Sequence, residues 1–173
     1  MALALRSVLI WTLLACQGVS PGQNAGNAHR SAWIRATDLL DAGNRVVVCR
    51  PFPDEGVTLV YTHSMYGGDV RERFVPAGRS LRRVEMTTAN PAAAEYYAST
   101  VSVTEVDGRF RVDAPPAGYD EIVVRVDDVG HHRLIVGDVT FDLLSLTGQA
   151  HRVRLDVVRE NRSSRWPGHL ERC

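Results

Sequence analysis

His63 and Glu72 are the two residues of this sequence best placed to do chemistry together. They lie on either side of Gly67-Gly68, which separates two segments of alternating apolar and polar residues. Two adjacent glycines adopt positive φ without steric cost, which is typical of a two-residue hairpin turn. Such a turn makes His63 and Glu72 cross-strand neighbours. The other cross-strand pairs that it predicts are Met65 with Val70 and Tyr61 with Phe74.

The hairpin face that carries His63 and Glu72 is predicted to point inward. Side chains alternate along a strand, so this face also carries Leu59, Tyr61, Met65, Val70 and Phe74. A carboxylate among such residues must be paired or hydrogen-bonded, because its uncompensated burial is costly. Two interpretations remain open: a ligand- or metal-binding pocket in which Glu72 orients the imidazole, or an ion pair that fixes the register of the hairpin.

Residues 90–98 predict a short helix that covers an open end of the structure. Asn90 is a good N-cap, Pro91 suits the first helical position, and good helix formers follow. The tyrosines of this segment either offer hydroxyls to a ligand or plug the core. Together with the hairpin, the segment makes up the candidate ligand- or partner-binding set: Tyr61, His63, Glu72, Glu95, Tyr96 and Tyr97.

The segments that must position these residues are short strands. Period-two alternation and β-branched residues predict strands at 45–50, 57–63, 69–75, 80–88, 99–105, 109–113, 121–126, 132–136, 138–144 and 151–158. Glycine and proline occupy the gaps between them. About ten short strands with one helical insert indicate an all-β fold, an antiparallel sandwich or barrel.

The first 16 residues have the order of an export signal. Arg6 precedes a short apolar run, and Leu13-Leu14-Ala15-Cys16 resembles a bacterial lipobox in which Cys16 carries the lipid. An ordinary secretory signal and an uncleaved anchor are the alternatives. We expect export, either to the outer face of the cytoplasmic membrane as a lipoprotein or as a secreted protein.

The rest of the chain divides into a tether, one β domain and a tail. We expect a flexible tether over 17–32, the domain over 33–158 and a C-terminal tail over 159–173. The composition, 45% hydrophobic with a net charge of +0, suits a globular domain and does not favour nucleic-acid binding. Outside the cytoplasm, Cys49 and Cys173 can form a disulfide. In the alternative interpretation, Cys49 is a small buried side chain.

The sequence predicts no catalytic residue, metal ligand or cofactor. A metal site could combine His63 and Glu72 with a histidine at 131, 132 or 151, but this spacing matches no ligand motif. Ser64 is adjacent to His63, and adjacent residues of a strand face opposite sides of the sheet. No nucleotide-binding glycine motif or Cys-x-x-Cys is present.

Three features follow one another within residues 38–158: Pro51-Phe52-Pro53, Tyr61-Thr62-His63-Ser64, and Glu72 nine residues after the histidine. In these features the segment resembles the bacterial domain-of-unknown-function family DUF1850. Met65 and Asp69 depart from the family pattern, and residues 90–98 replace its expected glycine-rich segment. The family is typically encoded beside TAXI-type TRAP transporters, which import small organic solutes.

The resemblance implies a function in solute transport. We expect an extracytoplasmic, non-catalytic accessory module that binds or interacts with a TRAP-type transporter. Its implied partner is the transporter permease or solute receptor, and the membrane is reached through the N-terminal lipid. A metal-dependent extracytoplasmic enzyme and a structural envelope lipoprotein are the alternatives.

Overall fold

The computed structural model of this chain describes residues 32–40, 43–98, 101–113 and 116–159. The predicted signal segment with Cys16, the tether up to residue 31, and the tail from residue 160 with Cys173 lie outside the described residues. Among the described residues, no helix has the length and apolar composition that a bilayer crossing requires.

Twelve strands and two short helices make up the described part of the chain. The strands are β1 (Ala32–Asp38), β2 (Arg45–Pro51), β3 (Val57–Thr62), β4 (Asp69–Ala77), β5 (Ser80–Thr88), β6 (Val103–Val106), β7 (Arg109–Val112), β8 (Gly118–Tyr119), β9 (Glu121–Arg125), β10 (Arg133–Val136), β11 (Val139–Asp142) and β12 (Arg152–Arg159). The helices are α2 (Pro91–Tyr97) and α3 (Leu143–Thr147). The predicted all-β class is confirmed.

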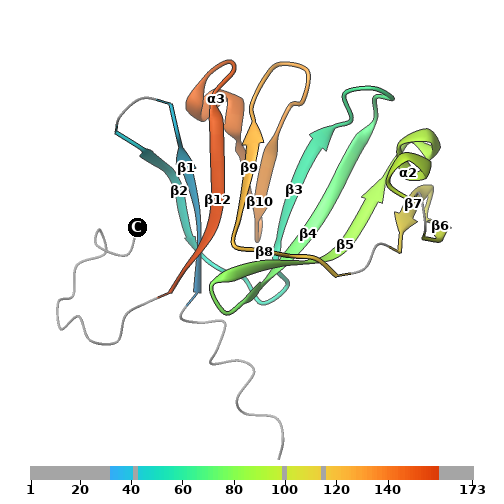
Figure 1. Ribbon diagram of the computed structural model, residues 1–173, viewed down its shortest axis with the longest axis horizontal. Helices are drawn as coiled ribbons and strands as arrows, with labels where there is room; N and C mark the ends of the chain where they lie inside the picture. The colour runs from blue at the N-terminus through green and yellow to red at the C-terminus, as the bar shows by residue number, and fades with distance from the viewer. Residues whose placement is uncertain (1–31, 41–42, 99–100, 114–115, 160–173) are drawn as a thin grey trace, which may run out of the picture.

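The strands form two antiparallel sheets that face each other as an open sandwich (Figure 1). The smaller sheet has the order β2-β1-β12-β9. The larger one has the order β11-β10-β3-β4-β5-β7-β6, with β8 paired to β5. Neither sheet closes on itself, so of the two predicted architectures the sandwich is confirmed and the barrel is not.

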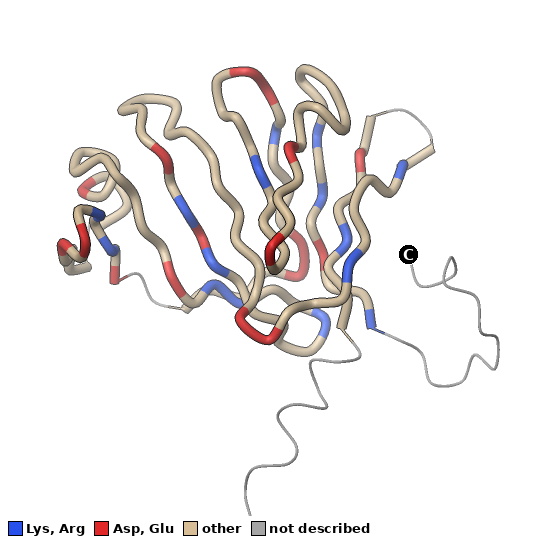
Figure 2. Tube along the Cα trace, turned by 180° about the vertical axis from the view of Figure 1, so that it is seen from behind, with Lys and Arg blue, Asp and Glu red and all other residues tan. Residues whose placement is uncertain are grey.

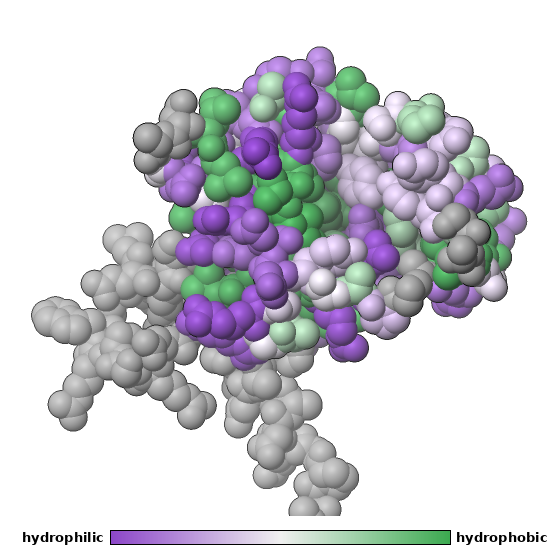
Figure 3. Space-filling view, in the orientation of Figure 1, coloured by the Kyte–Doolittle hydropathy of each residue, from purple (hydrophilic) through white to green (hydrophobic). Residues whose placement is uncertain are grey.

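The main core lies between the two sheets. Alternate residues of the central strands are fully buried, as Ile34 of β1, Leu155 of β12 and Leu59 of β3 illustrate. Figure 3 shows apolar side chains in the hollow at the centre of one face, flanked by hydrophilic residues. Burial of this apolar surface is the main force that holds the two sheets together.

A second, smaller core lies under α2, where the helix packs on the part of the larger sheet that contains β5 and β7 (Figure 1). There Val70, Met86 and Val112 of the sheet pack against Ala94 of the helix. The predicted helix is confirmed, since the side chain of Asn90 accepts a hydrogen bond from the N–H of Ala92 at 2.9 Å. The helix thus covers a part of the sheet that no strand faces.

The predicted register of the β3–β4 hairpin is wrong. Glu72 lies opposite Leu59, and Tyr61 lies opposite Val70, so His63 and Glu72 are not cross-strand neighbours. The strands end at Thr62 and Asp69, leaving a six-residue loop over 63–68 in place of a two-residue turn.

Backbone hydrogen bonds inside the loop explain the difference. The N–H of His63 donates to the carbonyl of Gly68 at 3.0 Å, and the N–H of Gly67 donates to the carbonyl of His63 at 2.9 Å. Gly67 and Gly68 do have the predicted positive φ, +66° and +76°. They are, however, only the last two residues of a six-residue loop and not a complete two-residue turn. Met65, predicted to face inward, lies in this loop and is 70% exposed.

Further differences from the prediction concern β1, the strand over 138–144 and Cys49. β1 was not predicted as a strand, although it lies inside its sheet, because its sequence Ala-Trp-Ile-Arg-Ala-Thr-Asp does not alternate between apolar and polar residues. The predicted strand over 138–144 ends early because Asp142 caps α3, accepting a hydrogen bond from the N–H of Ser145. Cys49 takes part in a disulfide, so its interpretation as an unpaired thiol is wrong.

Candidate functional site

A cavity of about 340 Å³ opens at one end of the sandwich. Its near wall consists of residues 61–65 and the two tyrosines of α2, and its lining is completed by Arg125, Asp127, Val129, Gly130 and His132. Gly130 adjoins the near wall, since its carbonyl accepts a hydrogen bond from the N–H of Thr62 at 2.7 Å. We call it the tyrosine–histidine cavity. Four of the six predicted binding residues line it: Tyr61, His63, Tyr96 and Tyr97.

His63 is held in one orientation at the inner end of the loop. The side chain is buried, and its Nδ1 accepts hydrogen bonds from the N–H groups of Met65 at 3.2 Å and Tyr66 at 3.3 Å. The ring lies 5.2 Å from the ring of Tyr66, 5.2 Å from that of Tyr96 and 5.4 Å from that of Tyr97. Because Nδ1 is an acceptor, the ring proton is on Nε2, which has no hydrogen-bond partner among the described residues.

Glu72 lies behind the cavity wall, where it binds other partners than His63. Its carboxylate accepts a hydrogen bond from the hydroxyl of Tyr61 at 2.8 Å and forms an ion pair with Arg83 at 3.1 Å. The hydroxyls of Tyr61 and Tyr97 are 3.1 Å apart. Burial, together with the charge of Glu72, raises the pKa of both tyrosines. Both phenols therefore stay protonated and act as fixed hydrogen-bonding groups.

His132 lies beside Tyr61 in the lining of the cavity. Its ring stacks on that of Tyr61 with centroids 5.6 Å apart, and its Nδ1 is buried without a hydrogen-bond partner in the described part of the chain. Burial lowers the pKa of His132, and the charge of Asp127 opposes this effect only in part. The ring fits closely against the backbone, since a Cβ atom on Gly130 would lie 2.4 Å from it. His132 is therefore a neutral, half-buried ring in contact with the cavity.

Asp127 and Arg125 add one negative and one positive charge to the lining of the cavity. Asp127 Oδ1 accepts hydrogen bonds from the N–H groups of Gly130 at 2.7 Å and Val129 at 3.2 Å, which leaves Oδ2 available. Arg125 ends β9 and is exposed, and no carboxylate within the described ranges forms an ion pair with it. Sequence reasoning missed both residues. An aspartate in a turn and an arginine at the end of a strand carry no signal of their own in the sequence.

The remaining predicted residues lie elsewhere. Glu95 is exposed and does not line the cavity. His131 is exposed, and Nδ1 of His151 lies 3.0 Å from the carboxylate of Asp38. The structure does bring His63 and His132 to the same cavity. However, within the described residues no group of three or more histidine, cysteine, aspartate or glutamate side chains is arranged to hold a metal ion.

The cavity combines aromatic walls with polar groups, such as Nδ1 of His132, that have no hydrogen-bond partner among the described residues. A nucleophile paired with a base is not among the groups that line it, since Ser64 is exposed and His63 Nδ1 is occupied by backbone N–H groups. The arrangement is suited to binding a small molecule with both apolar and polar parts.

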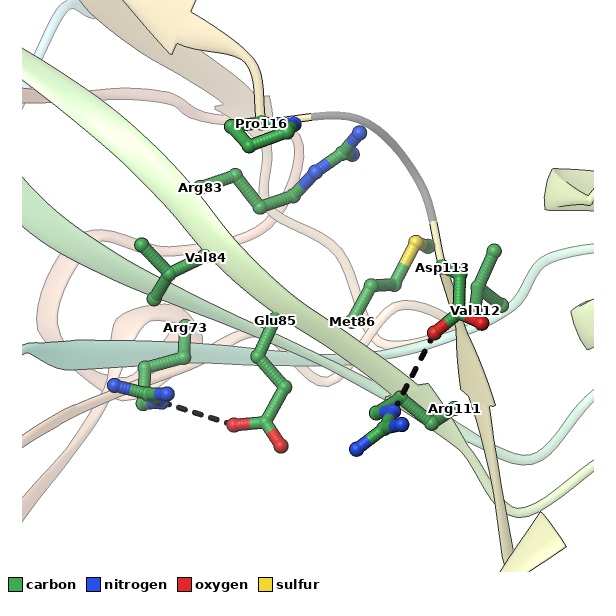
Figure 4. Close-up of a pocket in the computed structure, with 9 residues that line it drawn as sticks. All are labelled: Arg73, Arg83, Val84, Glu85, Met86, Arg111, Val112, Asp113 and Pro116. Atoms are coloured by element: carbon green, nitrogen blue, oxygen red, sulfur yellow. Dashed lines mark hydrogen bonds and ion pairs between the residues drawn. The ribbon is translucent and has the colours of Figure 1, made fainter. Parts of the chain in front are cut away.

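A larger cavity of about 420 Å³ lies beside β5 (Figure 4). Glu85 points toward Arg73 at 2.9 Å, and Asp113 points toward Arg111 at 3.5 Å. Arg83, which also lines it, is paired with Glu72. Because its charged groups already neutralise one another, this cavity is a weaker candidate than the tyrosine–histidine cavity.

Comparison with known families gives one match. Residues 57–143 match the family described as Domain of unknown function (DUF1850). The matched segment runs from β3 to the start of α3, so it includes every residue that lines the tyrosine–histidine cavity. Searches of curated proteins and of solved structures found no significant match.

Proposed function

Because this chain belongs to the DUF1850 family, for which no activity is described, we propose its function from its own structure. The protein is a non-catalytic binding module, and the tyrosine–histidine cavity is the site that receives its ligand or partner. Loop 63–68, α2 and the loop after β9 surround this site.

The observation that carries the proposal is the set of unsatisfied polar groups in an aromatic cavity. Nδ1 of His132 is buried without a hydrogen-bond partner in the part of the chain that the structure describes, and Nε2 of His63 has none there either. Tyr96 and Arg125 line the same cavity with exposed polar ends. Polar groups near buried surface normally find partners, so a bound molecule is the natural source of the missing ones. Preformed ligand sites have this combination of apolar walls and a few convergent polar groups.

We propose further that the module acts outside the cytoplasm as an accessory of a TRAP-type transporter. The apolar N-terminal segment with Leu13-Leu14-Ala15-Cys16 supports export and lipid anchoring. The resemblance to DUF1850 supports a partnership with the permease or the solute receptor. The distribution of charge is compatible with protein contact, since basic and acidic residues are interspersed over the described part of the chain (Figure 2).

Binding of a solute can be measured on the exported full chain. A panel of small organic acids, amines, sugars and amino acids is tested for an increase in the thermal unfolding midpoint. At least one compound should stabilise the protein, and Tyr96→Ala should abolish the effect. Glu95→Ala is the control, since Glu95 is the exposed neighbour of Tyr96 outside the cavity. Stabilisation that persists in Tyr96→Ala contradicts the assignment of the site.

The transporter partner can be tested with a photo-crosslinking amino acid in living cells. Placed at Tyr96, it should crosslink to the permease or receptor. Placed at Val139, an exposed residue of β11 that does not line the cavity, it should not. Recovery of no transporter component at position 96 contradicts the partnership. Metal-dependent turnover that His63→Ala abolishes would favour the alternative of an enzyme.

A further inference from the structure

We propose that the tyrosine–histidine cavity binds a small zwitterion, an α-amino acid with an apolar or aromatic side chain. This inference rests on the proposed binding function and names the chemical class of the ligand. It starts from two opposite charges that share one wall of the cavity without pairing.

Arg125 and Asp127 are placed on the same side of the chain. β9 ends at Arg125, and Asp127 begins the loop that follows; Val126 between them is fully buried, whereas both of its neighbours line the cavity. In an extended segment their Cα atoms are roughly 6–7 Å apart. No ion pair joins them, although both line the cavity. The wall therefore presents a positive and a negative group side by side, each with capacity for another partner.

The balance of charge selects a ligand that carries both signs. Arg125 and Asp127 are the only arginine and carboxylate among the residues that line the cavity. An organic anion would be repelled by Asp127, and an organic cation would be repelled by Arg125. A zwitterion satisfies both groups. By contrast, each charged residue that lines the cavity beside β5 already has an ion-pair partner.

The donors and acceptors fit the two ends of an amino acid. The guanidinium of Arg125 can bind a carboxylate through two parallel hydrogen bonds, and the Nε2 proton of His63 is a further donor. The free Oδ2 of Asp127 can accept from an ammonium group, because Oδ1 is already bonded to two backbone N–H groups. Aromatic faces nearby also attract an ammonium group.

The walls fit the side chain of such a ligand. The rings of Tyr61, Tyr96 and Tyr97 line the cavity and provide apolar surface. A volume of about 340 Å³ is at the lower end of the range of small-molecule sites, roughly 300–1,000 Å³. The cavity is thus large enough for a single amino acid, including one with an aromatic ring.

The test compares three probes that share one ring and differ only in charge. Calorimetric titration of the exported full chain is carried out with phenylalanine, with 3-phenylpropanoate, which lacks the ammonium group, and with phenethylamine, which lacks the carboxylate. We expect phenylalanine to bind about tenfold more tightly than either analogue, because each analogue leaves one charged group of the wall unpaired.

Two variants assign the charges to residues. Arg125→Gln should weaken phenylalanine and 3-phenylpropanoate about tenfold and spare phenethylamine. Asp127→Asn, whose amide oxygen can keep the loop hydrogen bonds, should weaken phenylalanine and phenethylamine and spare 3-phenylpropanoate. The controls are Arg152→Gln and Asp128→Asn, because neither residue lines the cavity. Arg152 lies opposite Arg125 on the neighbouring strand, and Asp128 follows Asp127 in the chain. Neither should change affinity.

Two outcomes overturn this inference. If the three probes bind equally, the site recognises the ring and not the zwitterion. If none binds while a compound of another class stabilises the protein through Tyr96, the cavity is a binding site for a different ligand. In both cases the proposed binding function stands. It fails only if no compound of the panel binds in the cavity.

Discussion

Glu72 is a structural residue of the cavity wall. Its carboxylate receives a hydrogen bond from Tyr61 and the charge of Arg83, and the side chains of the ion pair are only 13% and 19% exposed. Removing one partner of such a pair leaves the other partly buried and unpaired. Among the two interpretations of Glu72 that the sequence left open, its contacts favour an ion pair that fixes structure, although the partner is Arg83 and not His63.

The Glu72→Gln variant should be less stable than the natural protein by about 1–3 kcal/mol. Its ligand affinity should change little, because Glu72 does not line the cavity. Urea denaturation measures the first quantity, and calorimetric titration measures the second. The matched control is Glu85→Gln, whose ion pair with Arg73 is 40% and 41% exposed. It should cost at most about 1 kcal/mol. Equal losses in the two variants would contradict this assignment.

His132 makes stability depend on pH. Burial lowers its pKa in the folded state below the ordinary value of 6.5. As the pH falls through about 6.5, His132 therefore binds a proton in the unfolded chain before it does so in the folded protein. Above about pH 6.5 this histidine should not affect the free energy of unfolding, and below that pH it should lower it. Because the ring is only half-buried, we expect the decrease to stay under about 1 kcal/mol.

The measurement is the free energy of unfolding at pH 7.5 and at pH 5.5. The difference between the two values should be smaller in His132→Asn than in the natural protein. His131→Asn is the control, because His131 is exposed and asparagine tolerates its positive φ of +45°. An unchanged pH dependence in His132→Asn would show that the ring is not desolvated as the structure has it.

At the scale of elements, loop 63–68 and α2 form one unit. The side chain of Asn90 caps the helix through the N–H of Ala92 and donates to the carbonyl of Tyr66 at 2.6 Å. The backbone of Gly68 lies against the same asparagine. The position of His63 relative to Tyr96 and Tyr97 thus depends on this contact. The near wall of the cavity is assembled by one residue that joins two elements.

Substitution of the two loop glycines should separate backbone strain from this contact. Alanine at either position is strained by the positive φ, at a cost of roughly 1–2 kcal/mol. At Gly67 nothing lies within 4 Å of the added Cβ, but at Gly68 it would lie 2.8 Å from the Cβ of Asn90. We expect Gly68→Ala to lose about 1–3 kcal/mol more than Gly67→Ala.

Thermal unfolding of the two variants gives the comparison. Gly68→Ala should also weaken ligand binding, because moving Asn90 displaces the tyrosines of α2. Gly67→Ala should not. If both variants lose the same stability and the same affinity, the loop and the helix are not coupled through Asn90.

At the scale of the whole molecule, the cavity exists because the two sheets differ in width. The four-stranded sheet ends at β9, while the larger sheet continues through β4 and β5 to β7. The free edge of β9 carries Arg125, and α2 covers the part of the larger sheet beyond it. The site therefore lies where one layer of the sandwich ends and the helix begins.

The partner of Cys49 in its disulfide tests the proposed lipid attachment at Cys16. The chain has three cysteines, and the other two are Cys16 and Cys173. If Cys16 carries the lipid, its sulfur is not available, and Cys49 must bond to Cys173. Peptide mapping without reduction should therefore recover the Cys49–Cys173 pair. Recovery of Cys49 linked to Cys16 would contradict lipid attachment at Cys16.

The amino-acid sequence by itself determined the local features of this protein. Alternation over residues such as 152–158 was sufficient for the all-β class, because burial of one face of a strand leaves a period of two. The cap formed by Asn90 and the positive φ of Gly67 and Gly68 were equally accessible, because each depends on a residue's own backbone preferences. The sequence also predicted correctly that Glu72 faces inward. The predicted and observed registers of the hairpin differ by an even number of residues, so the same side chains share a face in both.

Only the tertiary structure decided which residues meet in the cavity. The register of the hairpin depends on where its loop closes, and Asn90, which lies outside the hairpin, helps to hold that loop. Arg125, Asp127 and His132 reach His63 because the end of β9 and the loop after it lie beside β3 at the open end of the sandwich. Contacts between residues so distant in sequence arise from the packing of two sheets, and no local pattern records that packing.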